Sequence, residues 1–129
     1  MKTIRIALLG IIMLMVLAAC GGGNVDEATA EKYSSKAEEV ITLLNNGHYD
    51  ELYEMFDATM KTALPLENMA EVFTPVIEES GDFEKMNKST VNEDDGLFIT
   101  ISSAKYSNKN RVYTITFNQD DEVAGLYVK

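Results

Sequence analysis

The stretch of residues 97–117, LFITISSAKYSNKNRVYTITF, decides the fold because its hydrophobic side chains recur at every second position in two runs. The alternating positions are Leu97, Ile99 and Ile101 in the first run and Tyr113, Ile115 and Phe117 in the second. A period of two predicts β-strands, since successive side chains of a strand point to opposite faces. The polar loop 107–110, SNKN, separates the runs and predicts an antiparallel hairpin.

Two further segments extend this hairpin into a sheet. Residues 83–91 form a looser strand, which is followed by the turn sequence Asp94-Asp95-Gly96. Residues 118–122 make a second turn, which leads into a last apolar run at 123–128. Together with the hairpin, these segments predict an antiparallel sheet of about four strands.

In the first half of the chain, the apolar residues recur with the spacing of a helix and not with a period of two. Residues 26 to 45 or 46 carry one apolar stripe, and Gly47 suits the left-handed position that follows a helix. A second helix fits 49–63, and a third begins at Pro65 and closes at Gly81. Pro75 should kink or split the third helix. Helices followed by antiparallel strands predict an α+β domain, with N-terminal helices packed on the sheet.

The start of the chain has the features of an export signal. Lys2 and Arg5 precede an uncharged apolar run at 6–19, which is shorter than the about 20 residues of a spanning helix and typical of a secretory signal peptide. The run ends Leu17-Ala18-Ala19-Cys20, which resembles the lipobox of bacterial lipoproteins. We expect cleavage before Cys20 and attachment of a diacylglyceryl group, with fatty acids such as palmitate, to its thiol.

This interpretation divides the chain into three segments. They are a signal peptide at 1–19, a lipidated cysteine with a flexible tether at 20–27, and a single α+β domain at 28–129. The expected location is the cell membrane, lipid-anchored and facing outside the cytoplasm. Two acyl chains on Cys20 would hold the protein far more firmly than one. The single cysteine leaves no internal disulfide.

The net charge of the chain argues against two classes of binding partner. The formal net charge is −10, and removal of Lys2 and Arg5 leaves nine basic against twenty-one acidic residues. This balance argues against binding to nucleic acid, which requires a basic patch. It also argues against adsorption of the protein surface to anionic lipid headgroups.

No set of residues predicts catalysis, a cofactor or a metal site. His48 is the only histidine and lies beside Gly47 in a turn, where exposure is the expected state. The acidic clusters 93–95 and 120–122 lack the spacing of a calcium-binding loop, and they are interpreted as solvated turns. We therefore expect no enzyme activity, no cofactor and no metal.

Aromatic residues offer a binding pocket between helices and sheet. The candidate residues are Tyr49, Tyr53, Phe56, Asp57, Tyr113 and Phe117. Aromatic side chains at this spacing are core residues in most proteins, and the functional alternative is a pocket under the helices. The expected function is non-catalytic binding of a small apolar ligand or of a neighbouring envelope protein.

Two other functions remain open at this stage. In one, a pocket carboxylate such as Asp57 acts as a catalytic base in a small-pocket enzyme. In the other, the protein is an accessory subunit that dimerises through the open sheet. Polar residues on the outer sheet face argue against a large apolar interface; they are Thr100, Ser102, Thr114 and Thr116.

The order of several short motifs resembles an uncharacterised family of bacterial domains. These motifs are LLNNGHYD at 43–50, Phe56-Asp57 with Met60-Lys61, Leu64-Pro65, Gly81 with Phe83, and VAGL at 123–126. Members occur as exported single domains or ahead of α/β-hydrolase domains. The resemblance implies a cystatin-like or nuclear-transport-factor-two-like fold with a curved sheet, and it supplies no catalytic residues. Pro75 departs from the family pattern.

Overall fold

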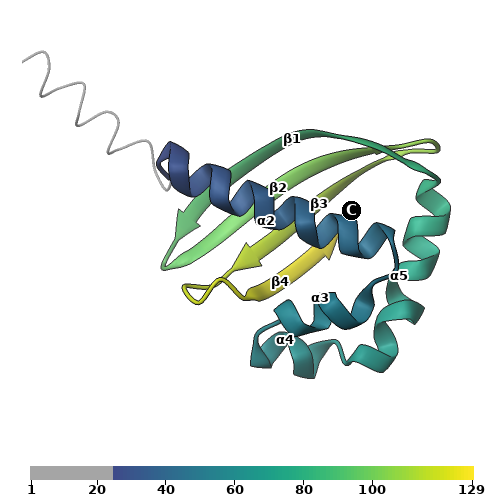
Figure 1. Cartoon of the computed structure of the whole chain (residues 1–129), viewed down its shortest axis with the longest axis horizontal. Helices are drawn as coiled ribbons and strands as arrows, with labels where there is room; N and C mark the ends of the chain where they lie inside the picture. Colours follow the sequence, from purple (N-terminus) through teal and green to yellow (C-terminus); the bar gives the residue numbers. More distant parts are fainter. Residues whose placement is uncertain (1–24) are drawn as a thin grey trace, which may run out of the picture.

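The computed structural model describes residues 25–129, which form a layer of helices and one antiparallel sheet (Figure 1). The helices are α2 (Glu27–Asn45), α3 (Tyr49–Met55), α4 (Ala58–Ala63) and α5 (Leu66–Ser80). The strands are β1 (Phe83–Asp94), β2 (Leu97–Tyr106), β3 (Asn110–Phe117) and β4 (Val123–Val128), in the order β1-β2-β3-β4. This arrangement confirms the predicted α+β class.

Helix α2 follows the predicted boundaries closely. The Asp26 side chain caps its start by accepting a hydrogen bond from the backbone N–H of Thr29 at 2.8 Å. Gly47 follows its end with a φ of +70°, a conformation that glycine adopts without strain. The signal peptide, Cys20 and most of the predicted tether lie outside the described residues, and no helix within 25–129 is long and apolar enough to cross a membrane.

The predicted helix 49–63 is wrong as a single element, because α3 and α4 are separated at Phe56 and Asp57. Phe56 is extended, has no exposed surface and forms a parallel bridge with Val123 of β4. The backbone N–H of Asp57 then donates to the carbonyl of Val123 at 2.9 Å. A continuous helix would lose both contacts, so this attachment to β4 divides the segment.

Helix α5 contradicts the expectation that Pro75 splits the third helix. The helix continues through Pro75 to Ser80, and Pro65 lies just before it as the N-cap residue. Proline removes the hydrogen bond to the carbonyl four residues earlier, which belongs here to Glu71. Both Pro75 and Glu71 are exposed, so water can hydrate that carbonyl and reduce the cost.

Strand β2 presents the opposite faces from those inferred for it. Thr100 and Ser102 have no exposed surface, whereas Ile101 is 40% exposed. The buried hydroxyl groups are satisfied inside the sheet, because Thr100 Oγ1 donates to the carbonyl of Ile115 at 2.9 Å and Ser102 bonds the Ser89 hydroxyl at 2.7 Å. The prediction that Thr100 and Ser102 face solvent is therefore wrong.

Helix α2 crosses the sheet on this buried side (Figure 1). Its stripe of buried residues forms one hydrophobic core with the inward residues of the sheet, as predicted from their periodicities. The main contributors are Val40, Ile41 and Leu44 from α2, and Tyr113, Ile115 and Phe117 from β3. No helix of residues 25–129 lies on the opposite face of the sheet.

Candidate functional site

Three of the six predicted pocket residues are core residues. Phe56, Tyr113 and Phe117 have no exposed surface. Phe117 lies beside the ring of Tyr33, with ring centroids 5.4 Å apart, and Phe56 lies 6.0 Å from the ring of Tyr53. Because these side chains fill the space between helices and sheet, the predicted aromatic pocket is replaced there by packed core.

The other three residues hold the helices in place. Tyr49 stacks on Phe73 of α5 at 6.3 Å, and Tyr53 lies under the ammonium group of Lys61 at 5.3 Å. Asp57 Oδ1 accepts a hydrogen bond from the backbone N–H of Met60 at 2.7 Å and so caps α4. A cap residue of this kind is occupied by its own helix, which removes the geometric basis for Asp57 as a pocket base.

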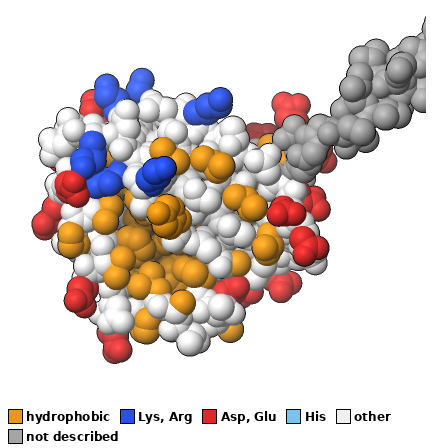
Figure 2. Space-filling view, turned by 180° about the vertical axis from the view of Figure 1, so that it is seen from behind, with side chains coloured by type: hydrophobic (Ala, Val, Ile, Leu, Met, Phe, Trp, Pro, Cys, Tyr) orange, Lys and Arg blue, Asp and Glu red, His pale blue; other side chains and the backbone are white. Residues whose placement is uncertain are grey.

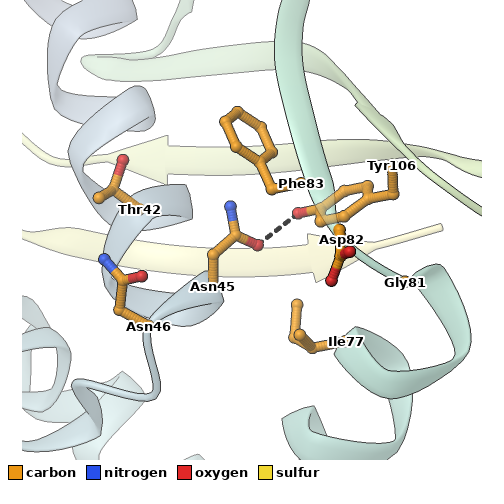
Figure 3. Close-up of a pocket in the computed structure, with 8 residues that line it drawn as sticks. All are labelled: Thr42, Asn45, Asn46, Ile77, Gly81, Asp82, Phe83 and Tyr106. Carbon is orange, nitrogen blue, oxygen red and sulfur yellow. Dashed lines mark hydrogen bonds between the residues drawn. The ribbon is translucent and has the colours of Figure 1, made fainter.

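A cavity lies elsewhere, where the end of α2 meets the junction of α5 and β1 (Figure 3). Its volume is about 480 Å³, which is within the range of small-molecule sites. Its lining residues are Thr42, Asn45 and Asn46 from the end of α2, Ile77, Gly81 and Asp82 from the end of α5, Phe83 from β1 and Tyr106 from β2.

A chain of hydrogen bonds fixes the inner wall of this cavity. The Tyr106 hydroxyl donates to Asn45 Oδ1 at 2.6 Å, and it also bonds the hydroxyl of Tyr113 (Figure 3 shows the first bond). Burial raises the pKa of both phenols, so both stay protonated at neutral pH. Since each phenol has one proton, Tyr113 must donate to Tyr106. The Asn45 amide is thereby held in place by its Oδ1 at the wall of the cavity.

The mouth of the cavity combines polar groups with one aromatic ring. Asn46 and Asp82 are exposed and offer an amide and a carboxylate. Phe83 is 43% exposed, and its ring meets that of Tyr106 edge-on at a centroid distance of 5.6 Å. The cavity can therefore bind a molecule that has several hydrogen-bonding groups and one apolar face.

The β2–β3 hairpin forms hydrogen bonds and ion pairs with the end of α5, which forms one wall of the cavity. Arg111 Nε donates to Ser80 Oγ at 2.7 Å, and the backbone N–H of Asp82 donates to Ser107 Oγ at 2.8 Å. Lys109 and Arg111 both form ion pairs with Glu79, and the pKa of its carboxyl is lowered by the hydrogen bond and charge of Lys109 and by the charge of Arg111. These contacts hold the wall at 81–82 in place before any ligand binds.

Gly81 is required at this junction for two reasons. Its φ is +86°, and a Cβ atom on it would lie 2.2 Å from Ser107 Oγ. The first observation disfavours any other L-residue and the second leaves no space for a methyl group. The junction between α5 and β1 therefore depends on this glycine.

Short motifs in the sequence include several residues of this cavity, although the hydrophobic periodicity does not predict it. Asn45-Asn46 and Gly81 with Phe83 belong to the motifs that carried the family resemblance, and the fold brings them together at one site. Tyr106 gave no signal, because it follows the strand predicted at 97–102 and its partner Asn45 is 61 residues away.

The remaining chemical candidates stay separate from the cavity. His48 is exposed, and its Nδ1 lies 3.9 Å from a carboxylate oxygen of Glu51 in the next turn. Within residues 25–129, no three histidine, cysteine or acidic side chains come together as a metal site.

These features define a small α+β domain with a polar cavity at the junction of its helical layer and its sheet. The chain belongs to the family described as protein of unknown function (DUF3887), whose model matches residues 37–126. A comparison with curated proteins found no match, and a comparison with solved structures found none either.

Proposed function

We propose that this protein is a membrane-anchored extracytoplasmic lipoprotein whose domain binds a small ligand without catalysis. The observation that carries the proposal is the cavity lined by Asn45, Asn46 and Phe83, with its inner wall fixed by the Tyr106 hydroxyl. A site that is already ordered loses little side-chain freedom on binding, which favours affinity. The lipobox-like sequence that ends at Cys20 supports the anchor.

The ligand class follows from the groups in the cavity. Amides of Asn45 and Asn46 and the carboxylate of Asp82 pair with hydroxyl and amide groups. The half-exposed ring of Phe83 contributes a flat apolar surface that a ring of C–H groups can cover. A hydroxylated ring, such as one sugar unit, combines both properties, whereas the small apolar ligand expected from the core aromatics matches only the second.

The binding site is testable by nuclear magnetic resonance, because the domain is small. The ¹⁵N-labelled mature chain is titrated with glucose, with N-acetylglucosamine and, as the apolar probe, with indole. We expect a sugar to shift the backbone signals of 45–46 and 81–83, and Phe83→Ala to weaken binding about tenfold or more. The matched control is Val72→Ala, a similarly exposed apolar residue on α5 outside the cavity.

Two results would contradict this proposal. If every probe leaves the signals of 45–46 and 81–83 unchanged at millimolar concentration, the cavity does not bind such ligands. If indole alone binds, the ligand class is wrong.

The anchor is tested separately by the mass of the protein extracted from membranes, which should include a diacylglyceryl group on Cys20. A Cys20→Ala variant should appear in the soluble fraction after export.

A further inference from the structure

Four lysines, at positions 85, 88, 105 and 129, lie on the face of the sheet that no helix of residues 25–129 covers. Lys85 of β1 lies directly opposite Lys105 of β2, and the backbone groups of Lys129 bond those of Val112 at the same end. Their neighbours Met86 and Ala104 face the core, so Lys85 and Lys105 point the other way. Figure 2 shows this face, with Lys and Arg side chains gathered at its upper left.

We define the open sheet face by six residues of this surface. They are Lys85, Lys88, Ile101, Lys105, Tyr127 and Lys129, and all are exposed. Lys88 lies opposite Ser103, while Ile101 and Tyr127 lie on either side of Thr114 in the register. Ile101 is 40% exposed and Tyr127 is 66% exposed, so hydrophobic surface adjoins the lysines.

This grouping is unfavourable for the isolated domain. Two like charges directly opposite each other in a sheet repel, and an acid at either position would remove the repulsion. The chain has twenty-one acidic and only eleven basic residues, yet neither Lys85 nor Lys105 forms an ion pair with any described residue. Glu84, in the adjoining bulge, lowers the local charge by one. The repulsion between these two lysines would be relieved by an anionic partner.

The tether limits what that partner can be. Five residues, 21–25, separate Cys20 from the cap residue Asp26, so the six steps between their Cα atoms span at most about 22 Å. On the proposed lipid anchor, the domain thus stays beside the bilayer at a very high effective concentration. Helix α2 begins near the end of β1, whereas Lys85 lies near its start, so the lysines lie away from the tethered end (Figure 1).

We infer that the open sheet face lies flat against the anionic headgroups of the membrane that holds the anchor. Lysine and tyrosine are residues that favour this interface, because each has a polar tip and an apolar body. Each lysine near an anionic surface favours contact by roughly fivefold. The net charge of −10 argued against such contact, but many of the acidic residues belong to α2 to α5, and the exposed Asp94 of β1 lies at the end of the strand opposite to Lys85.

The orientation has a consequence for the cavity. The sheet face and α2 lie on opposite sides of β1 and β2, so contact through the sheet turns the helical layer away from the bilayer. The cavity at Asn45 and Phe83 then opens toward the space outside the membrane. This inference rests on the proposed anchor, although not on the proposed ligand.

The experiment uses chemical attachment in place of biological lipidation. Because Cys20 is the only cysteine, the mature chain can be coupled through it to maleimide lipid in preformed vesicles. The chain has no tryptophan, so Tyr127→Trp places a single reporter on the open sheet face and Val72→Trp places one on α5. Quenching of each by brominated phosphatidylcholine is measured with and without 30% phosphatidylglycerol.

We expect strong quenching of Tyr127→Trp only in the anionic vesicles, its reversal by 0.5 M NaCl, and weak quenching of Val72→Trp in both. Adding Lys85→Gln and Lys105→Gln should reduce the Tyr127→Trp signal to the level of neutral vesicles. Lys36→Gln with Lys61→Gln changes the net charge equally on the helices and should leave it unchanged.

Equal quenching of the two reporters, or none in anionic vesicles, would overturn the inference. Burial of Tyr127→Trp that depends on protein concentration and not on lipid charge would show instead that the open sheet face joins two copies of the chain. Since the attachment is chemical, these outcomes do not depend on whether Cys20 is acylated in the cell. Failure of the anchor therefore appears only in the mass of the extracted protein.

Discussion

The pair of buried phenols gives the most specific prediction. In Tyr106→Phe, the change removes the one hydroxyl that contacts both Asn45 Oδ1 and the Tyr113 hydroxyl. Tyr113 is fully buried, so its O–H loses the acceptor that it has in the wild-type protein. In Tyr113→Phe, by contrast, Tyr106 still donates to Asn45 and no donor is orphaned.

The expected magnitudes follow from this difference. Tyr113→Phe removes one neutral hydrogen bond and should lower the free energy of unfolding by about 1 kcal/mol. Tyr106→Phe removes two and leaves a buried hydroxyl unpaired, which should cost about 2–3 kcal/mol. The double variant should cost about 2 kcal/mol, less than the sum of the single changes, because it orphans only the Asn45 oxygen.

Urea denaturation of the mature chain, followed by far-ultraviolet circular dichroism, measures all three variants against wild type. A change in midpoint with an unchanged slope reports stability alone. If both single variants cost the same and the double variant equals their sum, the two hydroxyls are not coupled and the proposed direction of the hydrogen bonds is refuted. Tyr106→Phe should also weaken sugar binding, because it frees the Asn45 side chain.

Three smaller predictions concern other positions. Asp57→Ala should cost about 1 kcal/mol through the lost cap of α4, and it should leave ligand titrations unchanged; a loss of binding would restore Asp57 as a site residue. Tyr33→Phe removes a 2.6 Å hydrogen bond to Asp121 and should cost about 1.5 kcal/mol at pH 7. Hydrogen bonds from Lys32 and Tyr33 lower the pKa of Asp121, so this stabilisation is present above the ordinary value of 3.8 and is lost as the pH falls through the lowered one; pH-dependent urea denaturation should show the difference shrinking in acid. Gly81→Ala should cost about 1–3 kcal/mol and show as a lower thermal midpoint, whereas no change would refute the requirement for a positive φ.

Local chemistry explains which helix boundaries were predictable. Asp26 caps the start of α2 and Gly47 follows its end, both through features within a few residues, so the sequence around them contains the whole signal. The break at Phe56 comes from Val123, which is far away in the chain, and no local pattern records it. Pro75 is the opposite case, because its sequence signal is local. The free-energy cost of this proline in a helix depends on whether residue 71 is exposed to water, and only the fold determines that exposure.

The candidate site was predictable only in part, for a related reason. The aromatic side chains were predicted to line a pocket. Phe56 and Tyr113 are buried instead, because such large groups fill the core. The cavity uses short polar residues at element ends, such as Asn46 and Asp82, whose composition is that of ordinary turns. Their convergence requires the hairpin contact between Ser107 and Asp82, which is a tertiary feature.

The faces of β2 allow this difference between pattern and packing to be tested directly. The alternation of 97–102 has the same period for either face, and hydrophobicity alone favours turning the isoleucines inward. In the structure the hydroxyl of Ser102 is paired with Ser89 on the buried side, and small side chains there make room for α2. Packing of the helix therefore outweighs the burial of Ile101.

Two single changes separate the two assignments of β2. Ser102→Ile places a large side chain beneath α2 and orphans the Ser89 hydroxyl, so it should cost about 1–3 kcal/mol. Ile101→Thr changes a side chain that is 40% exposed, and it should cost only about 0.5 kcal/mol. The opposite order in urea denaturation would mean that β2 buries its isoleucines. The open sheet face would then lack Ile101, and contact with a bilayer would depend on its lysines and Tyr127 alone.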